Sequence, residues 1–244
     1  MNRASIFGIL AATALTSAAQ ATTLYSNDFE SASTTDLSGS TAILDAPSGS
    51  TDFLGPLSTE NGTGSVTLTL DTAGYSSLTL TYDVYAIMTL DGDGPAGGNS
   101  PTNQDAFITS VTGGPTLEDY SFANYSGDTQ DYPVAGSKPQ TGATATNTLG
   151  YGNSGDATYA FTYTFVPTGN TTAIVFTGQD NQGTGDEYFG LDNIQVTGVP
   201  SVVGGVPEPA TWAMLLFGFF GLGGLLRAQR RSDRGVRGIQ RSAA

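Results

Sequence analysis

Carboxylates are the side chains of this sequence that are best able to bind metals or catalyse reactions, because it contains 22 Asp and Glu residues but no histidine and no cysteine. Without histidine, the usual general base, the usual zinc ligand and every Ser-His-Asp arrangement are excluded. Without cysteine, disulfides and thiolate metal sites are excluded as well. The carboxylates could still coordinate hard cations or act in pairs on glycosidic bonds.

Asp186 and Glu187 are the most attractive catalytic pair. Two carboxyl groups roughly 5 to 9.5 Å apart suffice for acid–base or nucleophilic work on a glycosidic bond. However, neighbouring residues on a strand point to opposite faces of the sheet, so these two carboxylates cannot act together on one glycosidic bond. The sequence therefore predicts no catalytic residue and a protein that is not an enzyme.

A second acidic group, Asp91-Gly92-Asp93-Gly94 followed by Asn99 and Asp105, superficially resembles a calcium loop. The positions that an EF-hand reserves for glycine and glutamate, counted from Asp91, hold Ala96 and Thr102. We interpret this segment as a long solvated connection.

Four tyrosines cluster in the central loops of the sequence. If they are exposed, they could stack on sugar rings while nearby Asp, Asn and Gln side chains bond the hydroxyl groups. Packing of these rings against the core is the alternative. The four candidates for ligand binding are Tyr120, Tyr125, Tyr132 and Tyr151.

The charge is strongly negative between Thr22 and Val206. This stretch holds 20 carboxylates, which are the 22 of the chain without Glu208 and Asp233, against Lys138 alone, so its formal net charge is −19. No basic surface exists there to neutralise phosphates, which argues against a nucleic-acid partner. Such a surface attracts cations, although the acidity could also simply keep an exported protein soluble.

Period-two alternation of apolar and polar residues recurs along the middle of the chain. It predicts about eight strands separated by Gly, Asn, Asp and Pro turns, and no capped soluble helix or fixed repeat. We expect one all-β domain, a jelly-roll-like antiparallel sandwich over residues 22–200. The predicted strands are residues 24–29, 66–70, 78–84, 105–111, 117–123, 161–165, 172–177 and 188–196.

The first and last predicted strands carry a resemblance to a known fold. Leu24-Tyr25-Ser26-Asn27-Asp28-Phe29-Glu30 and Glu187-Tyr188-Phe189-Gly190-Leu191-Asp192-Asn193-Ile194-Gln195-Val196 are similar to the terminal strands of galactose-binding-like jelly rolls, the fold of many carbohydrate-binding modules. The resemblance implies that these strands lie side by side and that Glu30 and Asp192 hold a structural Ca²⁺, with Asp28 a weaker candidate. Backbone carbonyls and water would complete its six to eight oxygen ligands. The alternative is a solvated Glu30 and an Asp192 that merely starts a turn.

The N-terminus has the pattern of a secretory signal peptide. Arg3 precedes an apolar run from Ile6 to Leu15, and Ala19-Gln20-Ala21 forms an A-x-A cleavage site. Residues 1–21 are therefore predicted to be a signal peptide, with the mature chain beginning near Thr22.

The C-terminus combines three features in a fixed order. A linker over residues 201–209 contains Pro207-Glu208-Pro209, an uncharged stretch of 17 residues follows over 210–226, and a basic tail occupies 227–244. The uncharged stretch is at the lower limit for a bilayer span and begins near Trp212, which suits the interface. The cluster of Arg227, Arg230 and Arg231 would remain in the cytoplasm.

This order resembles the PEP-CTERM sorting signal of Gram-negative bacteria, and the run Ala210-Thr211-Trp212-Ala213-Met214-Leu215 strengthens the match. The resemblance implies that a membrane-embedded exosortase cleaves near the motif and passes the body to a surface rich in extracellular polysaccharide. The same segment is catalogued as an ice-binding protein C-terminal region. Ice binding by the body is disfavoured, because its Thr-x-Thr pieces are not spaced as a repeat.

Taken together, the sequence predicts an exported, non-catalytic surface or extracellular-matrix protein that associates with extracellular polysaccharide and is stabilised by calcium. It would be anchored transiently in the inner membrane before exosortase processing. Two alternatives stay open, a structural surface protein without a specific ligand and a glycan-cleaving enzyme.

Overall fold

The chain forms two structural units. The computed structural model describes residues 20–59, 64–93, 105–180, 182–201 and 209–240, and the helical side chains from 212 to 227. One unit is Met1–Ser201 and contains every described strand, whereas the other is Val202–Ala244 and contains the helix α1 (Pro209–Gln240). The predicted signal peptide falls almost wholly on residues 1–19, outside the described part.

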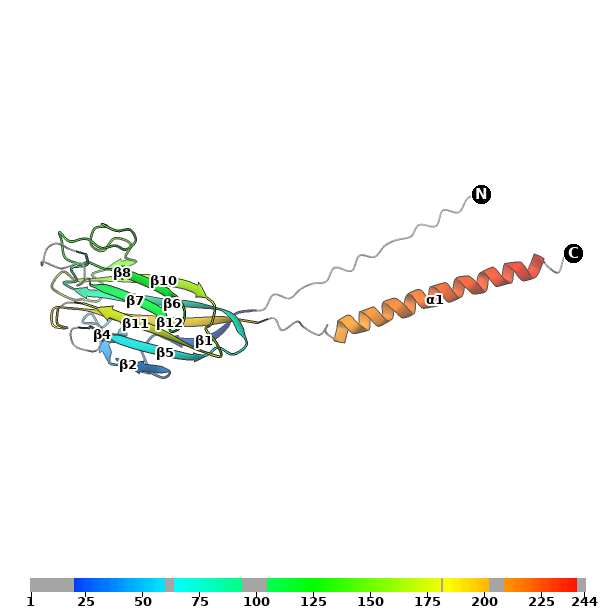
Figure 1. Cartoon of the computed structure of the whole chain (residues 1–244), viewed down its shortest axis with the longest axis horizontal. Helices are drawn as coiled ribbons and strands as arrows, with labels where there is room; N and C mark the ends of the chain where they lie inside the picture. Colours follow the sequence, from blue (N-terminus) through cyan, green and yellow to red (C-terminus); the bar gives the residue numbers. More distant parts are fainter. Residues whose placement is uncertain (1–19, 60–63, 94–104, 181, 202–208, 241–244) are drawn as a thin grey trace. The chain divides into compact units, whose positions relative to one another are not determined.

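The first unit is a sandwich of two antiparallel sheets (Figure 1). The larger sheet has the order β3-β4-β12-β6-β10-β9, with β1 also paired to β12, and the smaller has the order β2-β5-β11-β7-β8. This confirms the predicted fold class. The larger sheet consists of β1 (Thr22–Asn27), β3 (Ile43–Asp45), β4 (Asp52–Leu57), β6 (Tyr75–Met88), β9 (Ala145–Thr146), β10 (Asp156–Phe165) and β12 (Glu187–Pro200). The smaller consists of β2 (Leu37–Gly39), β5 (Ser65–Asp71), β7 (Ala106–Val111), β8 (Thr116–Ser121) and β11 (Thr171–Gln179).

Each of the eight predicted strands corresponds to an observed one, and four further strands were missed. Three of these, β2, β3 and β9, have only two or three residues, too few to show an alternation. The fourth, β4, contains Gly55-Pro56, and sequence rules place such residues in turns because proline cannot donate to the sheet ladder. It forms nevertheless because Phe53, Leu54 and Leu57 are buried.

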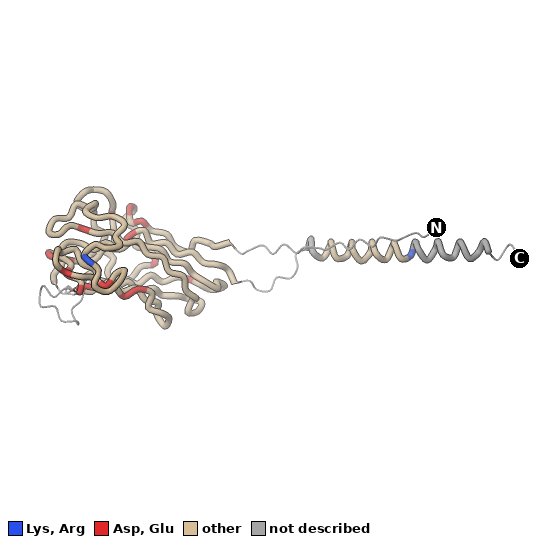
Figure 2. The backbone as a smooth tube through the Cα atoms, turned by 90° about the horizontal axis from the view of Figure 1, so that it is seen from above, with Lys and Arg blue, Asp and Glu red and all other residues tan. Residues whose placement is uncertain are grey.

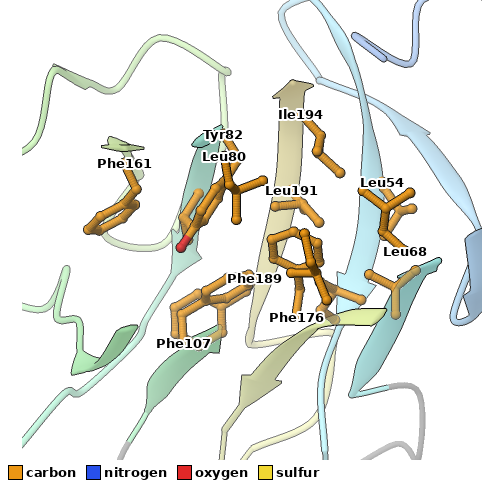
Figure 3. Packing of buried hydrophobic residues seen from close by; sticks show 14 of the residues in the cluster. Leu54, Leu68, Leu80, Tyr82, Phe107, Phe161, Phe176, Phe189, Leu191 and Ile194 are labelled. Carbon is orange, nitrogen blue, oxygen red and sulfur yellow. The ribbon is translucent and has the colours of Figure 1, made fainter. Parts of the chain in front are cut away.

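The alternation on β6 builds the core between the sheets. Leu78, Leu80 and Tyr82 point to the same side of this strand and are buried. Figure 3 shows Leu54 and Leu191 of the larger sheet packed near Leu68 and Phe176 of the smaller one. Burying each such side chain contributes about 1.5–3 kcal/mol.

A second, smaller cluster lies on the other face of the larger sheet, because Tyr85 and Ile87 alternate with Val84 and Ala86 along β6. The rings of Tyr85 and Phe53 meet edge to face with centroids 5.3 Å apart. This packing fixes the position of Tyr85, which contacts the candidate site described below. The cluster comprises Ala46, Phe53, Tyr85, Ile87, Leu149 and Tyr188.

Both clusters lie wholly within the sandwich. Their buried members all fall between Tyr25 and Val196, and β12 ends at Pro200. The segment 22–201 therefore carries a complete core of its own, so it folds without the C-terminal helix and can be studied as an isolated domain.

Candidate functional site

The terminal strands meet as the galactose-binding-like resemblance implied. β1 runs antiparallel to β12, with Tyr25 opposite Val196 and Asn27 opposite Ile194. Beyond β1 the chain turns, because Asn27 Oδ1 accepts a hydrogen bond from the Phe29 amide at 2.9 Å and Phe29 adopts a φ of 57°. This turn carries Glu30 out of the strand.

Glu30 and Asp192 come together at Thr51. The hydroxyl oxygen of Thr51 lies 2.7 Å from Glu30 Oε1 and 3.2 Å from Asp192 Oδ2. Glu30 Oε1 also accepts the Asp52 amide at 2.9 Å. The Tyr85 hydroxyl donates to Asp192 Oδ2 at 2.6 Å, so the outer cluster helps to position this carboxylate.

The two carboxylates differ in environment. Asp192 is only 1% exposed, and burial raises its pKa to about 6 against the opposing effect of hydrogen bonds from Tyr85, the Asn193 amide and Thr51. Glu30 is exposed, and hydrogen bonds from Thr51 and the Asp52 amide lower its pKa. A buried and an exposed acidic group thus face one hydroxyl.

Asp28 lies in the same turn but has a different contact. Its side chain is exposed, and Oδ1 accepts the Glu30 amide at 3.3 Å. It also lines a hollow of about 420 Å³ together with Asn27, Ser31 and Asp36. Glu30, Thr51 and Asp192 provide carboxylate and hydroxyl oxygens as potential ligands. Such oxygen ligands suit a hard cation such as Ca²⁺.

A second acidic group forms where the sequence indicated a solvated connection. That interpretation is wrong for Asp105, which is 0% exposed, and residues 94–104 lie outside the described part of the chain. Three carboxylate oxygens, one from each of Asp91, Asp105 and Glu187, all lie within 4.8 Å of one another. Glu187 was missed as a partner because only the fold brings it to Asp91 and Asp105, which are far away in the sequence.

The four candidate tyrosines do not share one surface. Tyr120 and Tyr132 are half-buried and contact each other edge to face at 5.2 Å, while the hydroxyl of the half-buried Tyr151 accepts a hydrogen bond from Tyr188 at 2.9 Å. Tyr125 is 47% exposed. A role for these residues in ligand binding stays a prediction, and Tyr125 is the candidate best placed to meet a ligand.

A hollow is lined by residues that directly flank Tyr125 in the chain. It has a volume of about 600 Å³ and includes Lys138, the one basic residue between Thr22 and Val206. Figure 2 shows the acidic residues of the body gathered mainly in the half that also holds this basic position. The lining residues are Asn124, Ser126, Gly127, Asp128, Lys138, Pro139 and Gln140.

The C-terminal tail is helical, but the helix runs to Gln240 and so extends beyond the predicted membrane span of residues 210–226 into the predicted basic tail. α1 begins at Pro209, whereas Pro207 and Glu208 lie outside the described residues. Its described apolar side chains, such as Phe217 and Leu222, are exposed. Among the helical segments that the structure describes, none is both long and apolar enough to cross a membrane.

Comparison with known proteins finds a PEP-CTERM protein-sorting motif over residues 205–231, which confirms the resemblance of the tail. No curated protein matches the chain. Among solved structures, an exo-β-1,3-galactanase from Phanerochaete chrysosporium, solved with β-1,3-galactotriose, is 17% identical with a TM-score of 0.33. That alignment covers 74% of this chain and 30% of the galactanase.

The K3 cleaved adhesin domain of Lys-gingipain from Porphyromonas gingivalis is 13% identical with a TM-score of 0.32, and the alignment covers 73% of this chain and 99% of the domain. Both likenesses are too weak to carry a conclusion about activity or ligand.

Proposed function

Because the chain carries a PEP-CTERM protein-sorting motif, we propose that it is an exosortase-processed surface or extracellular-matrix protein with a non-catalytic β-sandwich. The observation that carries the proposal is the position of the motif. It begins at residue 205, directly after a sandwich whose last strand ends at Pro200. A sorting tail at this point can be removed without disturbing the core.

The proposed route has three steps. Residues 1–21 direct export, residues 210–226 hold the chain transiently in the inner membrane, and Arg227, Arg230 and Arg231 keep the tail in the cytoplasm. Exosortase then cleaves near Pro207-Glu208-Pro209. The body reaches the cell surface or matrix of a Gram-negative bacterium.

We further propose that the body associates with extracellular polysaccharide at the hollow lined by Asn124 and Ser126, the two neighbours of Tyr125 in the chain. The hydroxyl group of Ser126, the ammonium group of Lys138 and the amide group of Gln140 can bond sugar hydroxyls. The exposed ring of Tyr125 offers a stacking surface. The lack of histidine and cysteine, which excludes the usual general base and the thiol nucleophile, supports a non-catalytic role.

Polysaccharide association predicts retention of the 22–201 domain in native gels that contain the host's matrix polysaccharide. Tyr125→Ala should abolish most of this retention, because one ring supplies most of the stacking area. Val166→Ala, which truncates another exposed apolar side chain, is the matched control and should migrate like the parent. Migration unaffected by the polysaccharide would favour a structural surface protein without a specific ligand.

We also propose that Ca²⁺ ties the first strand to the last at Glu30 and Asp192. The 22–206 segment carries far more carboxylates than its lone lysine can balance, so bringing two acidic strands together costs repulsion. A divalent cation between the two carboxylates would turn this repulsion into a net attraction. The Thr51 hydroxyl, which already faces both carboxylates, would be a further oxygen ligand.

Calcium removal should therefore lower the melting temperature of the 22–201 domain. An ion at a hundred times its Kd stabilises the folded state by about 2.7 kcal/mol, which corresponds to roughly 5 to 10 °C for a domain of this size. Glu30→Ala and Asp192→Ala should each lose most of the response between calcium and chelator, whereas Asp45→Ala, on an exposed carboxylate of β3, should keep it. An equal response in all four proteins would place the ion elsewhere.

A further inference from the structure

The acidic cluster of Asp91, Asp105 and Glu187 joins three separate parts of the sandwich. Asp91 and Asp105 flank the connection from β6 to β7, and Glu187 is the first residue of β12. Asp105 Oδ2 accepts the Asp91 amide at 2.6 Å and the Gly92 amide at 3.3 Å, which draws the two ends of the connection together. The cluster lies five residues along β12 from Asp192, roughly 16 Å at 3.3 Å per residue, so it is separate from the Glu30–Asp192 site.

The second carboxylate oxygen of Asp105 has no hydrogen-bond partner among the described residues. Asp105 is 0% exposed, and within this part of the chain no donor reaches its buried Oδ1 atom. Buried carboxylate oxygens normally accept hydrogen bonds, because a buried oxygen without a donor has lost its hydration and gained no bond in return. A cation can take the place of a donor at such an oxygen within an acidic cluster.

The charges around this oxygen also favour a cation. Burial raises the pKa of Asp105 to about 7, and the nearby carboxylates of Asp91 and Asp180 add to that effect against two backbone hydrogen bonds. Glu187 is also 0% exposed. Several acidic groups are thus held together where water cannot screen their repulsion.

We propose that Asp91, Asp105 and Glu187 form a second cation site, which takes calcium and holds the two described ends of the β6–β7 connection to the start of β12. A divalent cation supplies the missing partner of Asp105 Oδ1 and offsets the repulsion among the three carboxylates. Hard oxygen donors and the absence of histidine and cysteine exclude a soft metal, and irregular carboxylate geometry suits calcium better than the octahedral demands of magnesium. Water and backbone carbonyls complete the shell.

This site does not depend on the polysaccharide or on the Glu30–Asp192 site, and variants separate them. Native mass spectrometry of the 22–201 domain with calcium as the only divalent cation should show two bound ions. Asp105→Asn and Glu187→Gln should each lose one ion or weaken its Kd at least tenfold, while Glu30→Ala loses the other. One ion retained in Glu30→Ala and none in Glu30→Ala/Asp105→Asn would support the second site even if polysaccharide binding failed.

Thermal unfolding distinguishes an ion ligand from a merely structural carboxylate. In chelator, Asp105→Asn should melt at or above the parent temperature, because the variant removes one repelling charge and its amide can donate to Asp91 or Glu187. In calcium the order should reverse, with the variant several degrees below the parent. Asp119→Asn, on the exposed face of β8, should follow the parent in both solutions.

Three results would overturn the proposal. The first is full calcium stoichiometry and unchanged affinity in both Asp105→Asn and Glu187→Gln. The second is an equal loss of melting temperature by Asp105→Asn in calcium and in chelator, which would make Asp105 a loop residue only. The third is stabilisation of the parent through this cluster by magnesium but not by calcium.

Discussion

Replacing Pro207, Glu208 and Pro209 by alanine should change the protein from a processed surface form into a full-length form retained in the membrane fraction. The sorting motif spans residues 205–231 and includes these three residues, of which Pro209 is the first residue of the helix α1. The variant keeps the uncharged segment and the arginines, so it should still enter the membrane. Only recognition by exosortase should be lost, and the effect should be nearly complete.

Fractionation and immunoblotting of cells and medium measure this result. The matched control replaces Ser201, Val202 and Val203 by alanine, which changes three residues of the same linker just before the motif. The control should be processed like the parent. Equal size and location of the parent and the motif variant would contradict a sorting role for the tripeptide.

The second large effect concerns Glu118, an acid in the core between the sheets. It is 2% exposed, and Tyr82 of the opposite sheet donates its hydroxyl to Oε2. Its Oε1 atom is buried and has no hydrogen-bond partner in the described part of the chain. Burial raises the pKa of Glu118 from 4.5 to about 8. The folded domain therefore holds this proton far more tightly than the unfolded chain does.

This difference sets the sign of the pH dependence. Below pH 4.5 both states are protonated and Glu118 adds no slope, whereas between pH 4.5 and about 8 only the folded state keeps the proton. The free energy of unfolding should thus fall as pH rises through this window, by up to about 1.4 kcal/mol per pH unit. Above about pH 8 the contribution should be constant, because both states are ionised.

Urea unfolding of the 22–201 domain from pH 5 to pH 9 tests this, with Glu118→Gln as the variant that keeps the shape but cannot ionise. Other acids also titrate in this range, so the informative quantity is the difference between the parent and the variant. Glu118→Gln should flatten the slope, and Asp45→Asn, an exposed carboxylate, should not. Parallel pH profiles of the parent and Glu118→Gln would refute a protonated Glu118 in the core.

The sandwich could be predicted because alternation is a local property of the sequence. On β6, the run Leu78, Leu80, Tyr82, Val84 defines one buried face without reference to any other strand. The strand β4 could not be predicted in this way, because its glycine and proline look like a turn until its burial against β12 is known. The outer cluster around Tyr85 and Phe53 also depends on tertiary packing, because it needs both faces of one strand to be covered.

In the candidate sites, too, some features could be predicted from the sequence and others depend on tertiary packing. The pairing of Glu30 and Asp192 was expected from a resemblance of the terminal strands, and β1 does lie beside β12. Their shared contact with Thr51 had no signal in the sequence, since Thr51 precedes a strand that was missed. Likewise, Glu187 reaches Asp105 only through the packing of β12 near the β6–β7 connection, and no spacing rule links residues so far apart.

Intact mass measurement of the protein recovered from the medium and from the cell surface tests the central claim most directly. Export and exosortase processing predict a species that begins near Thr22 and ends near Pro207-Glu208-Pro209, without the residues of α1. A cell-associated species with the mass of all 244 residues, and no shorter form outside the cell, would contradict the account.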